Sequence, residues 1–175
     1  MAEFKETTLL LQHRFDPKAK QHYLNNNLSV LHCHHYLTLY TQLALDAGET
    51  KLLADTAEDV FLEMLQNYFG QHAVTELSEK IELGCQYFAA MGLGKLAVDY
   101  LGEFAGKVRM EKSHVDEGWI KKWGAFDAPV NYVGRAYISA LFSAVMGAGR
   151  GAYSVNEVES IVMGASQSVF NVTRD

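Results

Sequence analysis

The stretch from residue 31 to residue 36 reads Leu-His-Cys-His-His-Tyr and holds the densest group of possible metal ligands in the chain. Imidazole nitrogen and thiolate sulfur are common ligands in zinc and haem sites. The stretch falls in a predicted helix over 28–47, which follows the cap-like run Asn25-Asn26-Asn27 and ends at Gly48. In that helix His32, His35 and Tyr36 share one face with Leu39, while His34 points to solvent. At most two histidines therefore converge.

Two interpretations of His32 and His35 stay open at this point. As ligands of a metal or a haem iron they need a further ligand, for which His13, His22, His72 and His114 are the candidates. As partly buried, hydrogen-bonded histidines they line a core or a cavity without binding a metal, which is common for imidazoles. Cys33 lies at the margin of the apolar face, where packing is its simplest role.

Aromatic side chains in the second half of the sequence are the other feature that could carry a function. They are Trp119, Trp123, Phe126, Tyr132, Tyr137 and Phe142. Such residues line apolar ligand cavities, with hydroxyl and indole N–H groups as polar handles, and they also fill ordinary cores. If they line a cavity, we expect Trp119 and Tyr132 to flank its mouth. The candidate ligand-binding residues are then His32, His35, Tyr36, Leu39, Trp119, Tyr132 and Tyr137, and the speculative metal ligands are His32 and His35.

No pattern in the sequence predicts catalysis. It has no serine in a nucleophile-elbow context, no His-Glu-x-x-His and no dinucleotide-binding fingerprint. The run Gly92-Leu93-Gly94-Lys95 resembles a phosphate loop, yet it enters a strand and lacks a Ser or Thr after the lysine. The pair Glu157 and Glu159 is expected to lie on a solvated strand edge. We therefore expect no catalytic residues, and a binding function is favoured over an enzyme activity.

The composition is typical of a globular, cytoplasmic protein. The formal net charge is −6 over 175 residues, and the basic residues are scattered, so we expect no nucleic-acid partner. The charged N-terminus lacks the apolar run of a signal peptide, and no stretch approaches the ~20 apolar residues that span a bilayer. We therefore expect no membrane partner. Cys33 and Cys85 are expected to be reduced and largely buried.

Helical and strand-like patterns follow one another in blocks. Residues 1–24 lack a sustained period and are interpreted as an N-terminal arm, and 25–175 as a single ligand-binding domain. Three predicted helices, over 28–47, 50–70 and 73–90, precede any strand. A hairpin around a turn at 102–106, a loop, a helix over 130–146 and a closing hairpin over 153–172 follow. This order predicts an α+β fold, with N-terminal helices packed on an antiparallel sheet made of two hairpins with an intervening helix.

Several segments of the second half match one known pattern. They are Gly92–Leu96 entering a strand, Val108–Met110 with the segment 113–119 after it, the helix from Tyr132 to Gly147, and the closing hairpin with Met163-Gly164 and Phe170. Through them residues 90–173 resemble the 4-vinyl reductase domain family, small modules that bind hydrophobic or aromatic molecules. The resemblance implies a fold shared with haem-based nitric-oxide sensing domains and transport-protein-particle subunits. It also implies a homodimer and a ligand cavity between helices and sheet.

One departure from that family concerns metal binding. Many members carry two cysteines in the closing hairpin, which supply thiolate ligands to a metal, at the positions of Ser160 and Ser168. A serine hydroxyl does not supply a soft, easily deprotonated sulfur. Zinc at this hairpin is therefore not expected, and the cofactor is unknown, with haem or a transition metal at the histidine-rich segment as the open candidates.

These observations favour a small-molecule sensor or carrier, a homodimer with an enclosed apolar pocket for a hydrophobic or aromatic ligand. A haem- or metal-binding redox or gas sensor that uses the histidine-rich helix is the first alternative. A protein–protein interaction module, in which an exposed apolar surface binds the partner, is the second.

Overall fold

The chain begins with a small three-stranded sheet that its sequence pattern does not reveal. The computed structural model describes residues 8–31 and 33–175. Within them an antiparallel meander comes first, made of β1 (His13–Asp16), β2 (Gln21–Leu24) and β3 (Asn27–Ser29). Asn25 and Asn26 form the turn between β2 and β3 with φ of 47° and 65°, a region that asparagine tolerates better than most residues. The prediction that three helices precede any strand is therefore wrong, and the asparagine run is a hairpin turn instead of a helix cap.

The first helix, α1 (His34–Ala47), begins at His34 and not at Leu28. Leu28 belongs to β3, and Cys33 is the extended residue before the helix, with φ −80° and ψ 163°. Leu28 therefore lies at helical spacing from the later leucines only by chance, since it belongs to a strand and not to their helix. Gly48 ends the helix in the left-handed conformation, as predicted.

Three long helices stand where the periodicity placed them, namely α2 (Thr50–Gln71), α3 (Leu77–Ala90) and α5 (Tyr132–Met146). Helix α5 is the central one, because every residue from Val133 to Val145 except Arg135 is buried. Small side chains along it let α2 pack closely against it. Asn131 caps its N-terminus, since Asn131 Oδ1 accepts the backbone N–H of Gly134 at 2.8 Å.

A further helix, α4 (His114–Trp123), occupies the segment that we predicted as a loop after the first hairpin. Ser113 is its cap, and the Ser113 Oγ accepts the backbone N–H of Asp116 at 3.1 Å. Acidic residues stand in its first turn and lysines in its last, which complements the helix dipole. The Ser-x-x-Asp pattern before an apolar residue was the available signal for this helix.

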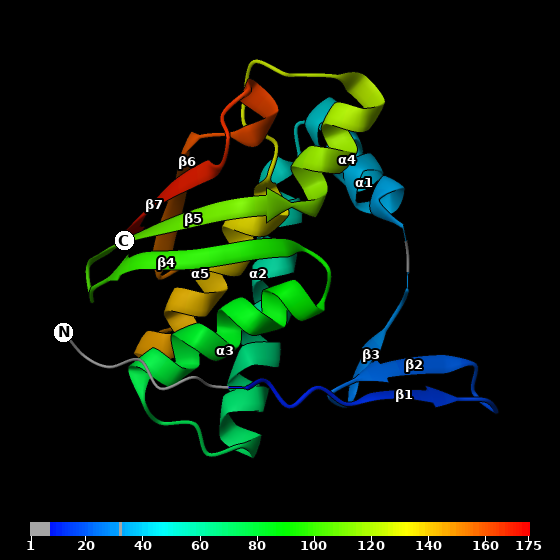
Figure 1. Cartoon of the computed structure of the whole chain (residues 1–175), viewed down its shortest axis with the longest axis vertical. Helices are drawn as coiled ribbons and strands as arrows, with labels where there is room; N and C mark the ends of the chain where they lie inside the picture. Colours follow the sequence, from blue (N-terminus) through cyan, green and yellow to red (C-terminus); the bar gives the residue numbers. More distant parts are fainter. Residues whose placement is uncertain (1–7, 32) are drawn as a thin grey trace.

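A four-stranded antiparallel sheet forms the second layer of the fold. It has the order β4-β5-β7-β6 and consists of β4 (Gly94–Leu101), β5 (Ala105–Ser113), β6 (Tyr153–Glu159) and β7 (Ser168–Arg174), with a 3-10 turn at Ile161–Met163. Helices α3 and α5 pack on this sheet, and the β1–β3 sheet stands apart from it beside α2 and α3 (Figure 1). The predicted α+β class, with two hairpins and an intervening helix, is confirmed.

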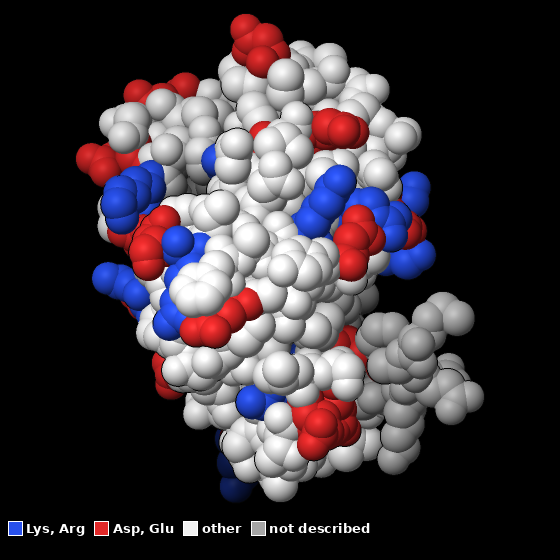
Figure 2. Space-filling view, turned by 90° about the vertical axis from the view of Figure 1, so that its left-hand side faces the viewer, with Lys and Arg blue, Asp and Glu red and all other residues white. Residues whose placement is uncertain are grey.

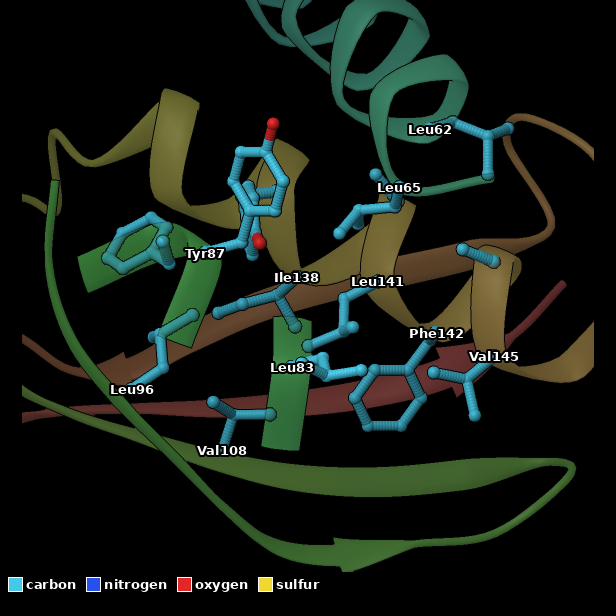
Figure 3. Packing of buried hydrophobic residues seen from close by; sticks show 14 of the residues in the cluster. Leu62, Leu65, Leu83, Tyr87, Leu96, Val108, Ile138, Leu141, Phe142 and Val145 are labelled. Atoms are coloured by element: carbon cyan, nitrogen blue, oxygen red, sulfur yellow. The ribbon is translucent and has the colours of Figure 1, made fainter. Parts of the chain in front are cut away.

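The main core lies between α2, α3, α5 and the inner face of the four-stranded sheet. Figure 3 shows Leu65, Leu83 and Leu141, one from each of the three helices, gathered above Val108 of the sheet. Tyr137 is fully buried in this core, and its hydroxyl donates to the Gly84 carbonyl oxygen at 2.6 Å. The core is therefore filled by large side chains, and the polar group of Tyr137 is satisfied within it.

Charges of both signs mix on the surface. Figure 2 shows Lys and Arg side chains beside Asp and Glu, with wide uncharged areas between them, and neither sign forms an extended field on that face. The outer face of the sheet follows this pattern through the ion pairs Lys95–Glu111 and Arg109–Asp99. Among the helices that the structure describes, none combines the length and the apolar character needed to cross a membrane.

Candidate functional site

A largely apolar cavity lies between the N-terminal sheet and the helices. Its volume is about 500 Å³, within the ~300–1,000 Å³ typical of ligand pockets. Apolar side chains from several elements line it, among them Leu24, Leu37, Phe61, Met64, Met91 and Val133. The four-stranded sheet contributes no lining residue. The cavity is thus bounded by helices on one side and by the small β1–β3 sheet on the other.

The N-terminal segment is held against the helices by few bonds. The backbone N–H of Leu9 donates to Gln86 Oε1 at 2.7 Å, and the N–H of Leu10 donates to the Tyr68 hydroxyl at 2.9 Å. Leu9 and Leu24 also pack against the main core. These contacts hold the wall that the β1–β3 sheet forms against α2 and α3.

Among the described residues, four polar side chains reach the cavity, from His13, His22, Ser29 and Tyr87. His13 Nε2 lies 2.9 Å from His22 Nδ1, and their rings stack with centroids 5.1 Å apart. The Tyr87 hydroxyl is buried and has no hydrogen-bond partner among the described residues. Burial raises the pKa of this hydroxyl, and the nearby amides of Asn25 and Asn27 oppose the shift. Tyr87 is therefore a protonated, unsatisfied hydrogen-bonding group on the wall of an apolar cavity.

The predicted residues of the histidine-rich segment do not line this cavity where the structure describes them. His32 lies outside the described residues. His35 is exposed at the start of α1, with its Nδ1 3.4 Å from Cys33 Sγ, and Tyr36 and Leu39 are also exposed. The expectation that Cys33 is largely buried is wrong, because Cys33 precedes α1 in an exposed, extended segment.

The aromatic residues of the second half divide between separate places. Trp119 is buried beside Trp123 and Phe126, with ring centroids 4.7 Å and 5.3 Å away, in a small second core. Tyr137 lies in the main core, and Tyr132 lies under the Arg135 guanidinium at 4.3 Å. These side chains do not line one cavity, since Trp119 belongs to the second core, Tyr137 to the main core and Tyr132 to the wall of a separate hollow. Their role in ligand binding stays a prediction.

Tyr132 and Arg135 border a second, more polar hollow of about 370 Å³. Lys51, Asp55 and Glu58 of α2 form its other side. Lys51 pairs with Asp55, and buried Glu58 accepts hydrogen bonds from Ser139 Oγ and the backbone N–H of Gly151. Opposite charges balance within this hollow, so it offers no field of one sign to a charged ligand.

A buried polar cluster joins the start of α4, the start of α5 and the closing hairpin. The Asn131 amide donates to Asp116 Oδ2 at 2.9 Å and to Ser113 Oγ at 2.8 Å. The Ser168 hydroxyl donates to Glu157 Oε1 at 2.8 Å. Burial, and then the Asp116 carboxylate, raise the pKa of Glu157 to about 6, and burial also raises that of Asp116. The expectation that Glu157 lies on a solvated edge is therefore wrong, because the strand turns it inward.

The side chains of this cluster show whether the closing hairpin offers ligands that a zinc ion prefers. Ser168 Oγ is engaged by Glu157 and by the backbone N–H of Ile161, and Ser160 Oγ is buried. One carboxylate and two hydroxyls are not the thiolate and imidazole set that zinc prefers, so these residues do not fit the metal. Among the described residues no group of three or more His, Cys, Asp or Glu side chains is arranged to hold a metal ion. His32, which the sequence predicts as a metal ligand, lies outside the described residues.

Sequence reasoning missed the residues that build the cavity wall. It considered His13 and His22 only as candidates for a further metal ligand, it interpreted Met64 as part of an apolar helix stripe, and it assigned no role to Leu24 or Tyr87. The pairing of β1 with β2 places His13 opposite Leu24 and His22 opposite Phe15, which explains how both histidines reach one surface. The available signal was the pair of turn-forming segments, Asp16–Lys20 and Asn25-Asn26, that separate these short strands.

Comparison with known proteins gives a fold-level likeness. No family model matches the chain, and no curated protein matches it in sequence. The crystal structure of the phenol-responsive sensory domain of the transcription activator PoxR with phenol is similar, with a TM-score of 0.78 and 15% identity, over 93% of this chain and 84% of that one. A vinyl-4-reductase family protein from Methanocaldococcus jannaschii is similar with a TM-score of 0.56 and 16% identity, over 84% of each chain.

The chain thus has the α+β fold of a class that includes a small-molecule sensory domain and a vinyl-4-reductase family protein. At identities of 15% and 16% the likeness concerns the fold, and the function has to be argued from the site.

Proposed function

We propose that this protein binds a small hydrophobic or aromatic molecule in the cavity between the β1–β3 sheet and the helices, and that it acts as a sensor or carrier. The observation that carries the proposal is a cavity of about 500 Å³ with apolar walls and one buried, unsatisfied hydroxyl. Apolar walls with few convergent polar groups are the usual composition of small-molecule sites.

The fold-level likeness supports the same proposal. The PoxR domain is described as phenol-responsive, and its structure contains phenol. A shared fold does not transfer a ligand, so this likeness supports the general class of function and leaves the choice of ligand to the cavity of this chain.

The N-terminal arm is part of the proposed site. In this proposal residues 25–175 form the ligand-binding domain, and His13, His22 and Leu24 of the arm form one wall of its cavity. The roles predicted for His32, His35, Tyr36, Leu39, Trp119, Tyr132 and Tyr137 stay predictions, as does a cytoplasmic location. The described residues contain no cluster of metal ligands that would support a haem- or metal-based function.

A substitution that fills the cavity tests the proposal. Ala89 and Ala90 are both exposed at the end of α3, but only Ala90 lines the cavity. With a small aromatic probe such as 2-naphthol at 100 times its Kd, ligand binding is expected to stabilise the wild type by ~2.7 kcal/mol, which raises Tm by several degrees. Ala90→Trp should lose this shift and Ala89→Trp should keep it. Equal shifts in both variants, or no shift with phenol, toluene and 2-naphthol, would contradict the proposal.

We also propose the homodimer that the family resemblance implies. The outer face of α1 exposes Tyr36, Leu39, Tyr40 and Leu43 at helical spacing, while its inner face packs on α2 and α4. An exposed apolar stripe of this kind marks a contact surface, and a second copy of the chain is the partner we propose. Sedimentation velocity with the Leu43→Glu variant tests this directly, since the variant should sediment as a monomer.

A further inference from the structure

The volume of the cavity sets the size of the molecule that fills it. A cavity of about 150 Å³ lined by Leu, Ile and Phe accommodates one benzene ring. The cavity beside α2 and α3 has about 500 Å³, roughly three times that volume. A single-ring ligand would leave most of the apolar wall without contact, and dispersion and burial would be lost over that area. The wall therefore favours a ligand with more than one ring.

The buried Tyr87 hydroxyl lies near a second, polar recess. Tyr87, whose hydroxyl lacks a partner, lines the cavity together with Met64. A smaller recess of about 150 Å³ adjoins it, with Met64 in common and with Asn25, Asn27 and Asn67 in its wall. The Asn25 Nδ2 is buried without a hydrogen-bond partner as well. Figure 3 shows the Tyr87 ring pointing away from the sheet residues Leu96 and Val108.

A buried hydrogen-bonding group without a partner lowers the stability of the protein, and a polar group on a bound ligand restores the missing hydrogen bond. A tyrosine hydroxyl both donates and accepts, so a hydroxyl on the ligand complements Tyr87. The other polar side chains of the described lining are His13 and His22, which pair with each other, and Ser29. The rest of the lining is apolar, so a second strongly polar group on the ligand would lose its hydration against most of the wall.

From these observations we infer that the ligand is a fused or linked arene of two or three rings that carries a single hydroxyl group, with the hydroxyl beside Tyr87. This inference rests on the proposed function, and it narrows that function to a class of ligand larger than a single-ring phenol. Tyr87 selects the hydroxyl, and the volume between Leu24, Phe61 and Met91 selects the ring number.

Equilibrium dialysis with phenol, 2-naphthol, 9-phenanthrol and 2-methylnaphthalene tests the inference on the full chain. The dissociation constant is expected to fall at least tenfold from phenol to 2-naphthol, because the second ring buries additional apolar surface. 9-Phenanthrol should bind at least as tightly as 2-naphthol. In the wild type 2-naphthol should bind about tenfold tighter than 2-methylnaphthalene, which lacks the hydroxyl.

The Tyr87→Phe variant should bind both naphthalenes with equal affinity, and Tyr100→Phe, an exposed tyrosine outside the cavity, should keep the wild-type preference. If phenol binds as tightly as 2-naphthol, the inferred ring number is wrong while the proposed function stands. If the preference for the hydroxyl survives in Tyr87→Phe, the assignment of Tyr87 is wrong. If none of the four compounds binds, both the inference and the proposed function are overturned.

Discussion

Replacing Glu157 by glutamine is expected to stabilise the protein by ~2 kcal/mol at pH 7.5, although most substitutions of buried residues destabilise. Burial and the Asp116 carboxylate raise the pKa of Glu157 from 4.5 to about 6, so the folded state favours its protonated form. Glutamine keeps an oxygen that accepts from Ser168 Oγ and carries no charge. Urea unfolding at pH 7.5 and at pH 4.5 measures the effect.

The sign of the pH dependence follows from the direction of the shift. Between pH 4.5 and about 6 the folded state holds more protons than the unfolded state, so the stabilisation from protonated Glu157 is full below pH 4.5 and is lost as pH rises through 6. The gain from Glu157→Gln should therefore fall to ~0.4 kcal/mol at pH 4.5. Glu159→Gln, an exposed position on the same strand, should have no effect at either pH. A loss of stability at pH 7.5 would contradict the raised pKa, because it would show that the fold favours the charged carboxylate of Glu157, with Arg135 as the nearby cation.

Replacing Gly94 by alanine is expected to cost ~4 kcal/mol, the largest loss we predict for a single methyl group. Gly94 begins β4 with φ of 143°, and a Cβ there would lie 2.0 Å from the carbonyl oxygen of Lys112. Both atoms belong to paired backbone, so neither moves without breaking the β4–β5 ladder. The free energy of unfolding from a urea titration measures the loss.

Gly92 provides the matched control for Gly94. It also has a positive φ, of 77°, but a Cβ at Gly92 meets no atom within 4 Å. Gly92→Ala should therefore cost only the ~1–2 kcal/mol of the left-handed backbone conformation. Equal losses in the two variants would mean that the contact with Lys112 is not what constrains Gly94.

The helices and the main sheet could be predicted because their signals are local. Apolar stripes over 50–70 and 130–146 and alternation around the turn at 102–106 each report burial on one face, which a sequence shows directly. The strands β1–β3 gave no such signal, since each has three or four residues that are only partly buried or exposed. The start of α1 was predicted too early for the same reason: the short strand β3 gave no signal of its own, and Leu28 in it happens to lie at helical spacing from the later leucines.

The cavity could not be predicted, because it depends on how distant segments pack. Leu24, Met64 and Tyr87 come from a strand and two helices, and each alone has the pattern of an ordinary core residue. The sequence did identify hydrophobic small-molecule binding as the favoured class, through a family resemblance in residues 90–173. The cavity itself lies mostly on residues before that segment, where the resemblance was only of element type and order.

The location of a bound aromatic ligand tests the central claim most directly. With ¹³C-methyl methionine in the protein, isotope-filtered nuclear Overhauser spectra of the 2-naphthol complex report which methionines touch the ring. Met64 and Met91 line the cavity, whereas Met110 lies in the main core and Met163 beside the second core. We predict cross-peaks from the ring protons to Met64 and Met91 and none to Met110 or Met163. Cross-peaks to Met110 would place the ligand between the helices and the four-stranded sheet, and would contradict the site proposed for this protein.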